Sequence, residues 1–486
     1  MKRVLNSKHP EINLLAFRAM ISEHHKSPYS LTLANMTCSK VRVFPAITFL
    51  LALLTGCASV EADSSQVQAA ATFPDFSSAS IGDAFDAGKI NELEHRMQKF
   101  VSDGDVKGIA ILLVKDGKVI SHTQAGVRRI MDGAPIEEDT LYRIYSMTKP
   151  ITGVALMMLY EQGLFSLDDP VSKFIPEFEE LTVVKSYDEE GNFETEPLER
   201  QPTMRELMSH TAGFAYGLYG DDPSNIAFMK KGILASPDLT TLIDRVASVP
   251  LMYQPGESWF YSVAVDIQGA IIERLTGMSL GKYLSLHVFQ PLKMNDTGFH
   301  VPASEYDRFS NVFGYHPVSK KFQLLPYEEA EYNVLGSVAF TKDSVGMESG
   351  GGGLVSSLGD YARFCQMLAN GGELEGKRIL KPETIKLMRT NVLDKNLTVS
   401  ISGTLTQAAG GELGFGLDFG ILHNTDNSLS KMGDGSYFWG GAAGTWFWVD
   451  PVNNLYFIGM IQSFPHGGPE LDFRGISRDL VYEALK

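Results

Sequence analysis

Cysteine is scarce in this chain, and its scarcity excludes a domain built on disulfides. The sequence holds three cysteines, Cys38, Cys57 and Cys365. Cys38 falls in an N-terminal segment of the kind that is removed on export, and Cys57, directly after that segment, is expected to be covalently modified, so one free thiol remains in the mature chain. A single thiol forms no intramolecular bridge. Because Cys365 lies in an amphipathic pattern, we expect it to be a core residue rather than a nucleophile.

Excess positive charge is also missing. The net charge is −16, and the first 56 residues hold seven basic and two acidic side chains, so the remainder carries 35 basic against 56 acidic residues. This balance argues against nucleic acid as a partner and indicates solubility rather than steering of cationic substrates. The sequence contains no H-E-x-x-H pattern and no phosphate-binding P-loop. We therefore predict no metal and no cofactor.

One apolar run stands near the N-terminus and is too short for a comfortable membrane span. Lys40 and Arg42 precede the apolar residues 43–54, and the run ends in Leu54-Thr55-Gly56-Cys57. A basic flank, a short apolar segment and small residues predict an export signal. The ending resembles a bacterial lipobox, which implies that Cys57 becomes the lipidated first residue. The alternative is an ordinary signal peptide with an incidental cysteine.

The surroundings of this signal predict where the protein resides. Residues 58 and 59 are Ala and Ser, so the aspartate that retains such lipoproteins at the inner membrane is absent. We expect an exported bacterial lipoprotein that faces the periplasm and is anchored by Cys57, in the outer membrane. Met36 is the expected start, which makes residues 1–56 a presequence and signal peptide; an unusually long presequence is the alternative. Residues 57–80 have the composition of a flexible tether.

Periodicity beyond the tether predicts an α/β (α+β) fold. Apolar runs separated by turn residues predict strands near both ends of the chain, and helical patterns fill the middle. The expected strands are 108–114, 119–125, 415–421, 444–449 and 455–461, and the expected terminal helices are 91–101 and 470–485. We expect one antiparallel sheet flanked by helices, built from residues 81–160 and 411–486, and a mostly helical second domain over 161–410.

Ser146-Met147-Thr148-Lys149 places a nucleophile and an amine one helical turn apart. Residues i and i+3 share a helix face, so Lys149 comes within reach of the Ser146 hydroxyl if the serine opens a helix. A free serine is a weak nucleophile and needs a neighbouring base. A helix N-terminus adds a field and amides that stabilise an oxyanion. The spacing by itself is common among unrelated helices.

Two further segments supply candidate partners for Ser146. Tyr261 follows the turn Pro255-Gly256, and beside a lysine its phenol is able to carry a proton; alone, it reads as a buried aromatic. Trp439-Gly440-Gly441-Ala442 allows close approach of backbone to a ligand, with the Ala442 amide facing the Ser146 amide across a reacting carbonyl. The alternative for this segment is a glycine-rich turn that only connects strands.

Five segments in this order resemble the serine β-lactamase and penicillin-binding-protein superfamily, and in particular the class C-like esterases called family VIII carboxylesterases. They are Tyr145 to Pro150, Leu207 to Gly213, Pro255 to Ser262, Gly351 to Ser357 and Trp439 to Gly441. The resemblance spans about residues 85 to 486. It implies Ser146 as nucleophile, Lys149 and Tyr261 as proton-transfer partners, and an oxyanion hole formed by the Ser146 and Ala442 amides.

Two departures from the β-lactamase pattern predict the subclass. Where those enzymes have Tyr-x-Asn, this chain has Tyr261-Ser262-Val263, and where they have Lys-Thr-Gly it has Trp439-Gly440-Gly441. The lysine attracts a substrate carboxylate, whereas Trp439 offers an apolar plane. We therefore expect Trp439, Gly440 and Gly441 to bind a less polar substrate, and a carboxylesterase acting on small esters. Tyr216, Tyr219 and Phe260 are further candidates for the pocket, without motif support.

Two residues invite other interpretations of the active site. His210 stands before Thr211-Ala212-Gly213, but Lys149 and Tyr261 already fill the proton-transfer roles, so we expect His210 to fix a loop. Gly277-Met278-Ser279-Leu280-Gly281 matches the G-x-S-x-G elbow of α/β-hydrolases. An elbow needs a strand before its serine, whereas residues 267–275 have helical spacing, so Ser279 is expected to cap a helix.

Three functional hypotheses follow. The first is hydrolysis of short acyl or aryl esters through an acyl-enzyme at Ser146. The second is a β-lactamase or a D-amino-acid peptidase that uses the same residues. The third is a penicillin-binding sensor that is acylated without turnover, against which the intact set of Ser146, Lys149 and Tyr261 argues. The oligomeric state is not encoded in any of these patterns.

Replacement of each candidate serine distinguishes the two possible nucleophiles. We expect Ser146→Ala to abolish turnover of a p-nitrophenyl ester and Ser279→Ala to retain it, because Ser279 is expected to be a helix cap. The measurement is the rate of p-nitrophenol release by each variant. The opposite pattern would establish the α/β-hydrolase alternative.

Overall fold

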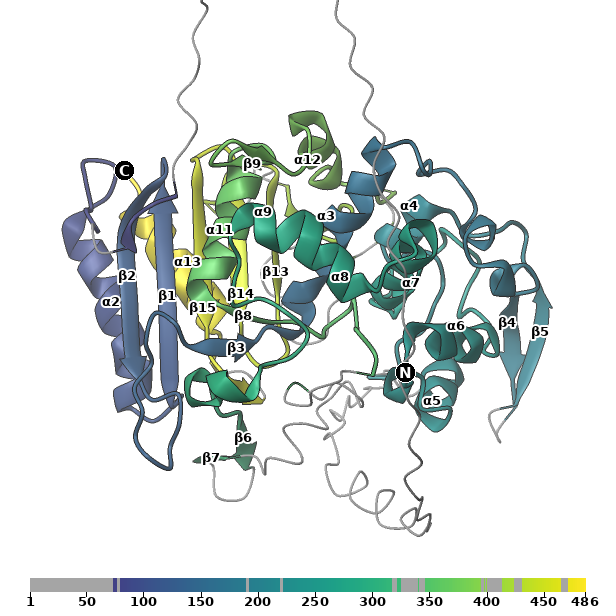
Figure 1. Ribbon diagram of the computed structural model, residues 1–486, viewed down its shortest axis with the longest axis horizontal. Coiled ribbons are helices and arrows are strands. Elements are labelled where there is room, and N and C mark those ends of the chain that lie inside the picture. Colours follow the sequence, from purple (N-terminus) through teal and green to yellow (C-terminus); the bar gives the residue numbers. More distant parts are fainter. Residues whose placement is uncertain are drawn as a thin grey trace, which may run out of the picture. The chain divides into compact units, whose positions relative to one another are not determined.

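The central sheet is assembled from both ends of the chain (Figure 1). The computed structural model describes residues 73–486 except 77–78, 189–191, 219–221, 317–320, 325–339, 341–345, 395–396, 398, 400–412, 424–430 and 465–470. β1 (Gly108–Lys115) pairs antiparallel with β2 (Lys118–Gly126) and with β15 (Leu455–Met460). This pairing places Ala110 opposite Met460 and confirms the predicted antiparallel sheet from both termini.

The other strands extend the sheet from β15. Within the described residues the order is β11-β12-β13-β14-β15-β1-β2, and every neighbouring pair is antiparallel. The added strands are β11 (Leu413–Phe415), β12 (Gly420–Leu422), β13 (Ser436–Gly440) and β14 (Trp446–Asp450). Short connections, such as the turn between β14 and β15, are those that antiparallel neighbours allow.

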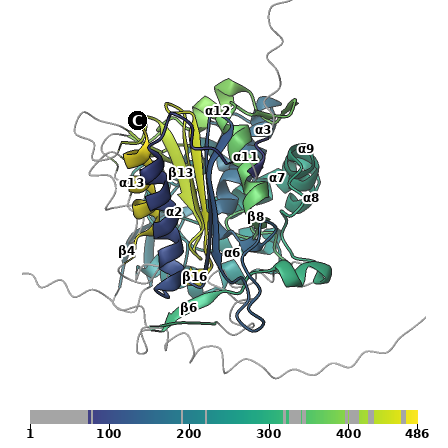
Figure 2. The same ribbon diagram turned by 90° about the vertical axis from the view of Figure 1, so that its left-hand side faces the viewer.

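Helices cover both faces of the sheet, as Figure 2 shows edge-on. α2 (Ala87–Ser102) and α13 (Phe473–Ala484) pack together on one face, and α11 (Leu358–Ala369) packs against strands on the other. The sheet therefore separates two hydrophobic cores.

Side chains of β1 point alternately into the two hydrophobic cores. Ile111 belongs to the core that contains Phe100 of α2, whereas its neighbour Leu112 belongs to the core that contains Tyr361 of α11. Successive side chains of a strand point to opposite faces, so a strand covered on both sides reads as a continuous apolar run. This is why 108–114 has no polar position.

A helical region adjoins the second core. α3 (Thr148–Glu161) packs against α7 (Ala264–Thr276), and every residue of α3 from Thr148 to Met157 is buried. The remaining helices are α4 (Met204–Met208), α5 (Pro223–Lys230), α6 (Leu239–Ala247), α8 (Leu280–Leu284), α9 (Gln290–Leu292) and α12 (Pro382–Met388). A helix that is apolar on all sides must be enclosed, which fixes α3 at the centre of this region.

Small strand pairs complete the described chain. β3 pairs with β8, β4 with β5, β6 with β7 and β16, and β9 with β10. Their bounds are β3 (Leu141–Arg143), β4 (Thr182–Tyr187), β5 (Phe193–Pro197), β6 (Phe313–His316), β7 (Lys321–Leu324), β8 (Val355–Ser357), β9 (Glu373–Leu374), β10 (Lys377–Arg378) and β16 (Ser463–Phe464). Among the described helices, none is long and apolar enough to cross a membrane.

Two predictions for single residues are confirmed by the fold. Cys365 is fully buried in α11 and has no partner cysteine among the described residues. Ser279 is the N-cap of α8, where its hydroxyl accepts a hydrogen bond from the Lys282 amide at 3.3 Å. The serine of the G-x-S-x-G match therefore stands between two helices, α7 and α8, and not after a strand.

The predicted strands near the C-terminus need correction. The single strand expected over 415–421 is wrong: β11 ends at Phe415, and β12 begins at Gly420 after a turn in which Asp418 has a φ of 63°. Strand β13, which carries Trp439, is missing from the strands expected from the sequence. The strand expected from Gly444 begins at Trp446, because residues 441–445 form a turn with the Gly441 amide donating to the Thr445 carbonyl at 2.7 Å.

Packing between β14 and β15 gives a test of the sheet. A Cβ on Gly459 would lie 2.2 Å from the ring of Trp446, its cross-strand neighbour. We expect Gly459→Ala to destabilise the protein by about 2 kcal/mol, since overpacking a close-packed core forces side chains off their rotamers. The measurement is the unfolding midpoint in urea.

Gly359→Ala in α11 is the matched control. A Cβ there meets only Phe76, at an ordinary 3.8 Å, so we expect an unchanged or slightly raised midpoint. Equal effects of the two substitutions would contradict the tight packing of Gly459 against Trp446.

Candidate active site

Ser146 lies where a buried strand turns into a buried helix. β3 leads through Ile144 into a 3₁₀ turn, Tyr145–Met147, and then directly into α3. Tyr145 is fully buried and has a φ of 43°, a left-handed conformation that few non-glycine residues adopt. Between Leu141 and Pro150, Ser146 is the residue that keeps partial exposure while the others are buried. The turn therefore presents one hydroxyl at the surface of a buried segment.

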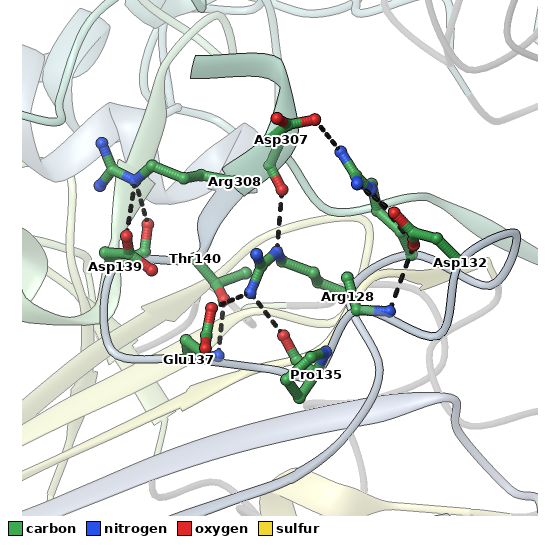
Figure 3. A network of polar contacts seen from close by, with 10 residues as sticks. Arg128, Asp132, Pro135, Glu137, Asp139, Thr140, Asp307 and Arg308 are labelled. Carbon is green, nitrogen blue, oxygen red and sulfur yellow. Dashed lines mark hydrogen bonds and ion pairs between the residues drawn. The ribbon is translucent and has the colours of Figure 1, made fainter. Parts of the chain in front are cut away.

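A polar network holds the loop that leads into β3 (Figure 3). Arg128 donates to the Pro135 carbonyl at 2.7 Å and to the Asp307 carbonyl at 2.9 Å, and it also pairs with Glu137. Arg308 donates to the Asp139 carbonyl at 2.9 Å. These contacts tie residues 128–139 to the 3₁₀ turn Ala303–Arg308 and so fix the entry to the Ser146 segment.

Lys149 is fully enclosed and reaches three oxygen atoms. Its Nζ lies 3.3 Å from Ser146 Oγ, 2.9 Å from the Tyr216 hydroxyl and 2.6 Å from the Gly351 carbonyl. The Gly351 carbonyl is an acceptor only, whereas both hydroxyls either donate or accept. A neutral amine that donates to Gly351 and Tyr216 directs its lone pair at the Ser146 hydroxyl. This is the geometry of a base beside a nucleophile.

Burial allows part of the Lys149 population to be an uncharged amine near pH 7. Burial lowers the pKa of Lys149 to about 7, and the negative charge of Asp266 opposes this shift. Lys149 also stands in the first turn of α3, whose positive end disfavours an ammonium. Removing a lysine side chain from water destabilises its ammonium form relative to the neutral amine, and this desolvation lowers the lysine pKa strongly.

Tyr261 is a second contact of the Ser146 hydroxyl. It precedes α7, makes a hydrogen bond to Ser146, and accepts one from the Trp439 indole Nε1 at 3.3 Å. Lys149 Nζ lies 4.5 Å from the centre of the Tyr261 ring. Burial raises the pKa of Tyr261, so its hydroxyl keeps its proton at neutral pH. A protonated phenol of this kind is suited to relay a proton between two groups rather than to act as the base that removes the serine proton.

The turn after β13 packs directly against the Ser146 segment. A Cβ on Gly441 would lie 2.3 Å from the Ile144 carbonyl, so only glycine permits this approach. The Thr445 hydroxyl donates to the same carbonyl at 3.3 Å, and the Arg474 guanidinium donates to the Gly441 carbonyl at 3.0 Å. Ala442 follows Gly441 and keeps partial exposure, as Ser146 does. The turn after β13 and the segment that carries Ser146 are therefore in direct contact.

The structure brings together residues that are remote in sequence. Ser146, Lys149, Tyr261 and Trp439 form a connected set of hydrogen bonds and ring contacts, with Gly440 and Gly441 at its edge. Trp439 contributes an indole N–H to this set as well as the apolar plane that its sequence position indicates. Tyr219 and Cys57 lie outside the described residues.

Sequence reasoning misses two partners of Lys149. The sequence presents Tyr216 only as a pocket candidate and Gly351 only as part of a matching segment, yet both contact Nζ. Asn225 fixes the Tyr216 backbone, because its side-chain oxygen accepts from the Tyr216 and Gly217 amides at 2.9 and 2.8 Å. No spacing rule links these positions, since they come from separate loops. Phe260, the other pocket candidate, is half-buried and packs against the larger core.

His210 supports the Tyr261 loop. Its Nδ1 accepts the Ser262 amide at 3.2 Å, and its ring lies 4.9 Å from that of Tyr261. Burial, aided by the charge of Lys149, lowers the pKa of His210 well below its usual range. A neutral imidazole whose Nδ1 is occupied by backbone positions the loop, in keeping with the loop-fixing role expected for it.

The sequence profile of the family described as Beta-lactamase matches residues 93–477. The chain belongs to the β-lactamase family. It is 32% identical over 367 residues to an uncharacterised protein of Mycobacterium tuberculosis, covering 74% of this chain and 87% of that protein. It is 30% identical over 391 residues to Esterase EstB of Burkholderia gladioli, covering 77% and 90%.

The fold agrees with this membership. The solved structure of EstCE1, a hydrolase with promiscuous acyltransferase activity, matches with a TM-score of 0.66 at 23% identity, covering 81% of this chain and 98% of that one. This confirms the α/β (α+β) fold expected from the sequence, an antiparallel sheet packed against helices, and identifies it as the β-lactamase/transpeptidase fold of the superfamily that the five segments resemble.

The pH dependence of Ser146 modification tests the Lys149 geometry. We expect the rate of labelling by a fluorophosphonate to rise with pH through a midpoint near the lysine pKa of about 7, because the amine accepts the serine proton only when neutral. Lys149→Met should lower the rate at least ~100-fold. Lys282→Met, which alters an exposed lysine of α8, is the control and should leave rate and midpoint unchanged. A rate that does not vary with pH across this range would contradict the arrangement.

Proposed function

We propose that this protein hydrolyses small acyl or aryl esters through an acyl-enzyme on Ser146. The observation that carries the proposal is the contact between the hydroxyl of the partly exposed Ser146 and the buried Lys149 amine, 3.3 Å apart, with the Tyr261 hydroxyl hydrogen-bonded to the same serine. This set contains the nucleophile, the base and the proton carrier that acyl transfer requires.

Acylation begins with proton transfer from Ser146 to neutral Lys149. The Ser146 oxygen then attacks the ester carbonyl, and the Ser146 and Ala442 amides stabilise the oxyanion that develops. The proton on Lys149 passes through the Tyr261 hydroxyl to the departing alcohol. In this scheme Lys149 is the primary base, because burial favours its neutral form, whereas burial of Tyr261 disfavours a phenolate.

Deacylation repeats these steps with water in place of the alcohol. Water loses a proton through Tyr261 to Lys149, attacks the acyl carbonyl and releases the carboxylic acid, and Ser146 recovers its proton. The hydrogen bond from the Trp439 indole to the Tyr261 oxygen stabilises the transient negative charge on that oxygen. Trp439 thereby acts on the proton carrier as well as on the substrate.

Two substitutions in the β-lactamase pattern favour esters over β-lactams. Trp439 occupies the position where a lysine would attract a substrate carboxylate, and Phe415 packs edge-on against it with ring centres 5.3 Å apart. Val263, at the position of the usual asparagine, is fully buried and offers no amide to a polar side chain. The site therefore lacks two protein groups that would bind a charged, polar substrate, and a neutral ester needs neither of them.

Named relatives support the same reaction class. Esterase EstB is described as an esterase, and a second relative, the lovastatin esterase of Penicillium rubens, is 26% identical over 389 residues, covering 76% of this chain and 92% of that protein. β-Lactam hydrolysis, D-amino-acid peptidase activity and acylation without turnover are the competing outcomes on the same residues.

We also propose that the protein is an exported lipoprotein, anchored in the outer membrane through Cys57. The support is the sequence pattern of a basic flank, a short apolar segment and Leu54-Thr55-Gly56-Cys57. The folded residues then act on ester substrates in the periplasm.

A direct comparison of two substrates tests the proposed activity. We expect kcat/KM for p-nitrophenyl butyrate to exceed that for a chromogenic cephalosporin by at least ~100-fold, since loss of a charge partner and an amide removes about 3 kcal/mol of binding to the cephalosporin. Ser146→Ala sets the background for both. Faster cephalosporin hydrolysis would indicate a β-lactamase, and one stoichiometric burst without turnover would indicate a sensor.

A further inference from the structure

Two buried carboxyl groups near Lys149 have no part in the proposed acyl transfer. Asp266 belongs to the first turn of α7, and Asp418 lies in the turn between β11 and β12; each residue is 1% exposed. A buried carboxylate needs either hydrogen-bond donors or a counter-ion, and a buried carboxylic acid needs neither to the same degree. The two groups differ in how they meet this requirement.

Asp266 has the contacts of an ionised carboxylate. Its Oδ1 accepts a hydrogen bond from the Ser349 hydroxyl at 2.6 Å and a second from the Gly351 amide at 3.1 Å. A Cβ on Gly351 would lie 2.5 Å from Asp266 Oδ2, so the carboxyl group rests directly on this glycine. Two donors on one oxygen stabilise the charged form.

The same glycine connects Asp266 to Lys149. Gly351 donates its amide to Asp266 and accepts the Lys149 ammonium or amine on its carbonyl at 2.6 Å. Thr152, one turn beyond Lys149 in α3, donates to the Gly350 carbonyl at 2.9 Å. The segment is therefore held between α7 and α3, and the Asp266 carboxylate lies one residue of backbone away from Lys149 Nζ.

Asp418 has the contacts of a protonated acid. Its Oδ1 accepts one hydrogen bond, from the Gln268 side chain at 3.0 Å, and its Oδ2 is buried without a hydrogen-bond partner in the described structure. That oxygen rests on Gly153 of α3, where a Cβ would lie 2.5 Å away. A single neutral donor compensates poorly for burial of a full charge. A proton on Asp418 resolves this.

We propose that Asp266 is a positioning residue for Lys149: its carboxylate holds Gly351 against the lysine and acts as the counter-ion of the charged lysine, whereas Asp418 is a neutral neighbour. The inference rests on the proposed role of Lys149 as base. It divides two carboxyl groups of equal burial into one that sets the protonation of the base and one that does not.

Other titratable groups around Lys149 do not take this role. Tyr216 contacts the lysine through its hydroxyl, burial raises the pKa of Tyr261 so that it stays a neutral phenol, and burial together with the charge of Lys149 keeps His210 neutral by lowering its pKa. Burial raises the pKa of both aspartates, and the charge of Lys149 opposes this shift for both, aided by hydrogen bonds from Ser349 and Gly351 to Asp266 and from Gln268 to Asp418. The two groups differ in their donors: two hydrogen bonds reach Asp266, whereas one reaches Asp418, whose second oxygen is buried without a partner in the described structure.

Asparagine replacements in the full-length protein separate the two carboxyl groups. Asp266→Asn keeps the acceptor for Ser349 and Gly351 and removes the charge, so the ammonium form of Lys149 is less stable. We expect the midpoint of the pH–rate profile for fluorophosphonate labelling of Ser146 to fall by about one pH unit or more, the size of one carboxylate's effect at an effective dielectric constant of about 20. Asp418→Asn replaces one neutral group by another and should leave the midpoint within ~0.2 units.

A second measurement reports the lysine without any acylation. The ¹³Cε resonance of Lys149, assigned by its absence in Lys149→Met, should titrate with the same lowered midpoint in Asp266→Asn and an unchanged one in Asp418→Asn. An unshifted lysine midpoint in Asp266→Asn, or a larger shift in Asp418→Asn, would overturn the proposal. A slower rate at every pH with no shift would also overturn it, because that is the result of a merely structural role.

These readouts keep the proposal distinct from the esterase assignment. If Asp266→Asn lowers the titration midpoint of Lys149 but the wild-type protein releases no p-nitrophenol from esters, Asp266 is supported as the positioning residue and ester hydrolysis is refuted. A protein that hydrolyses esters with no response of Lys149 to Asp266→Asn supports the esterase assignment and refutes the positioning role.

Discussion

The enclosed Lys149 amine is the constraint on which the rest of this site depends. A lysine without access to water needs hydrogen-bond partners from the protein, and here they come from Ser146 one turn away, from the Tyr216 loop and from Gly351 before β8. Loss of one would leave a buried polar group unpaired, which costs about 1–3 kcal/mol. The same enclosure brings the pKa to about 7, so that amine and ammonium are both populated near neutral pH. The enclosure of Lys149 therefore both destabilises its ammonium form and makes its reactive neutral amine available.

Aromatic side chains surround Tyr261. The Tyr261 ring centre lies between 4.9 and 6.4 Å from those of Trp259, Trp439, Tyr216 and His210, and Phe415 contacts the same cluster. Such a cluster excludes water from the Tyr261 side chain and leaves the Trp439 N–H as a directional contact to its oxygen. A lysine at position 439 would bring charge into this cluster, which the present packing does not accommodate.

Local sequence determined much about this protein. The period of apolar residues located β1, β2, β15 and the terminal helices, because each strand or helix needs a buried face of fixed spacing. The pair Ser146 and Lys149 was recognisable because three residues span about one helical turn, and Ser279 could be set aside because its flanks are helical. The order of five segments indicated the family, and with it the candidates Tyr261 and Trp439.

Only the tertiary structure decided how these residues meet. The strand expected over 415–421 was wrong because Asp418 takes a left-handed turn that brings its carboxyl group under α3, a contact that no local pattern encodes. The contacts of Tyr216, Gly351 and Asp266 around Lys149 were equally hidden, since a hydrogen bond between loops depends on where the folded backbone places them. Burial, and with it the protonation of Lys149, is a property of the whole packed core rather than of any segment.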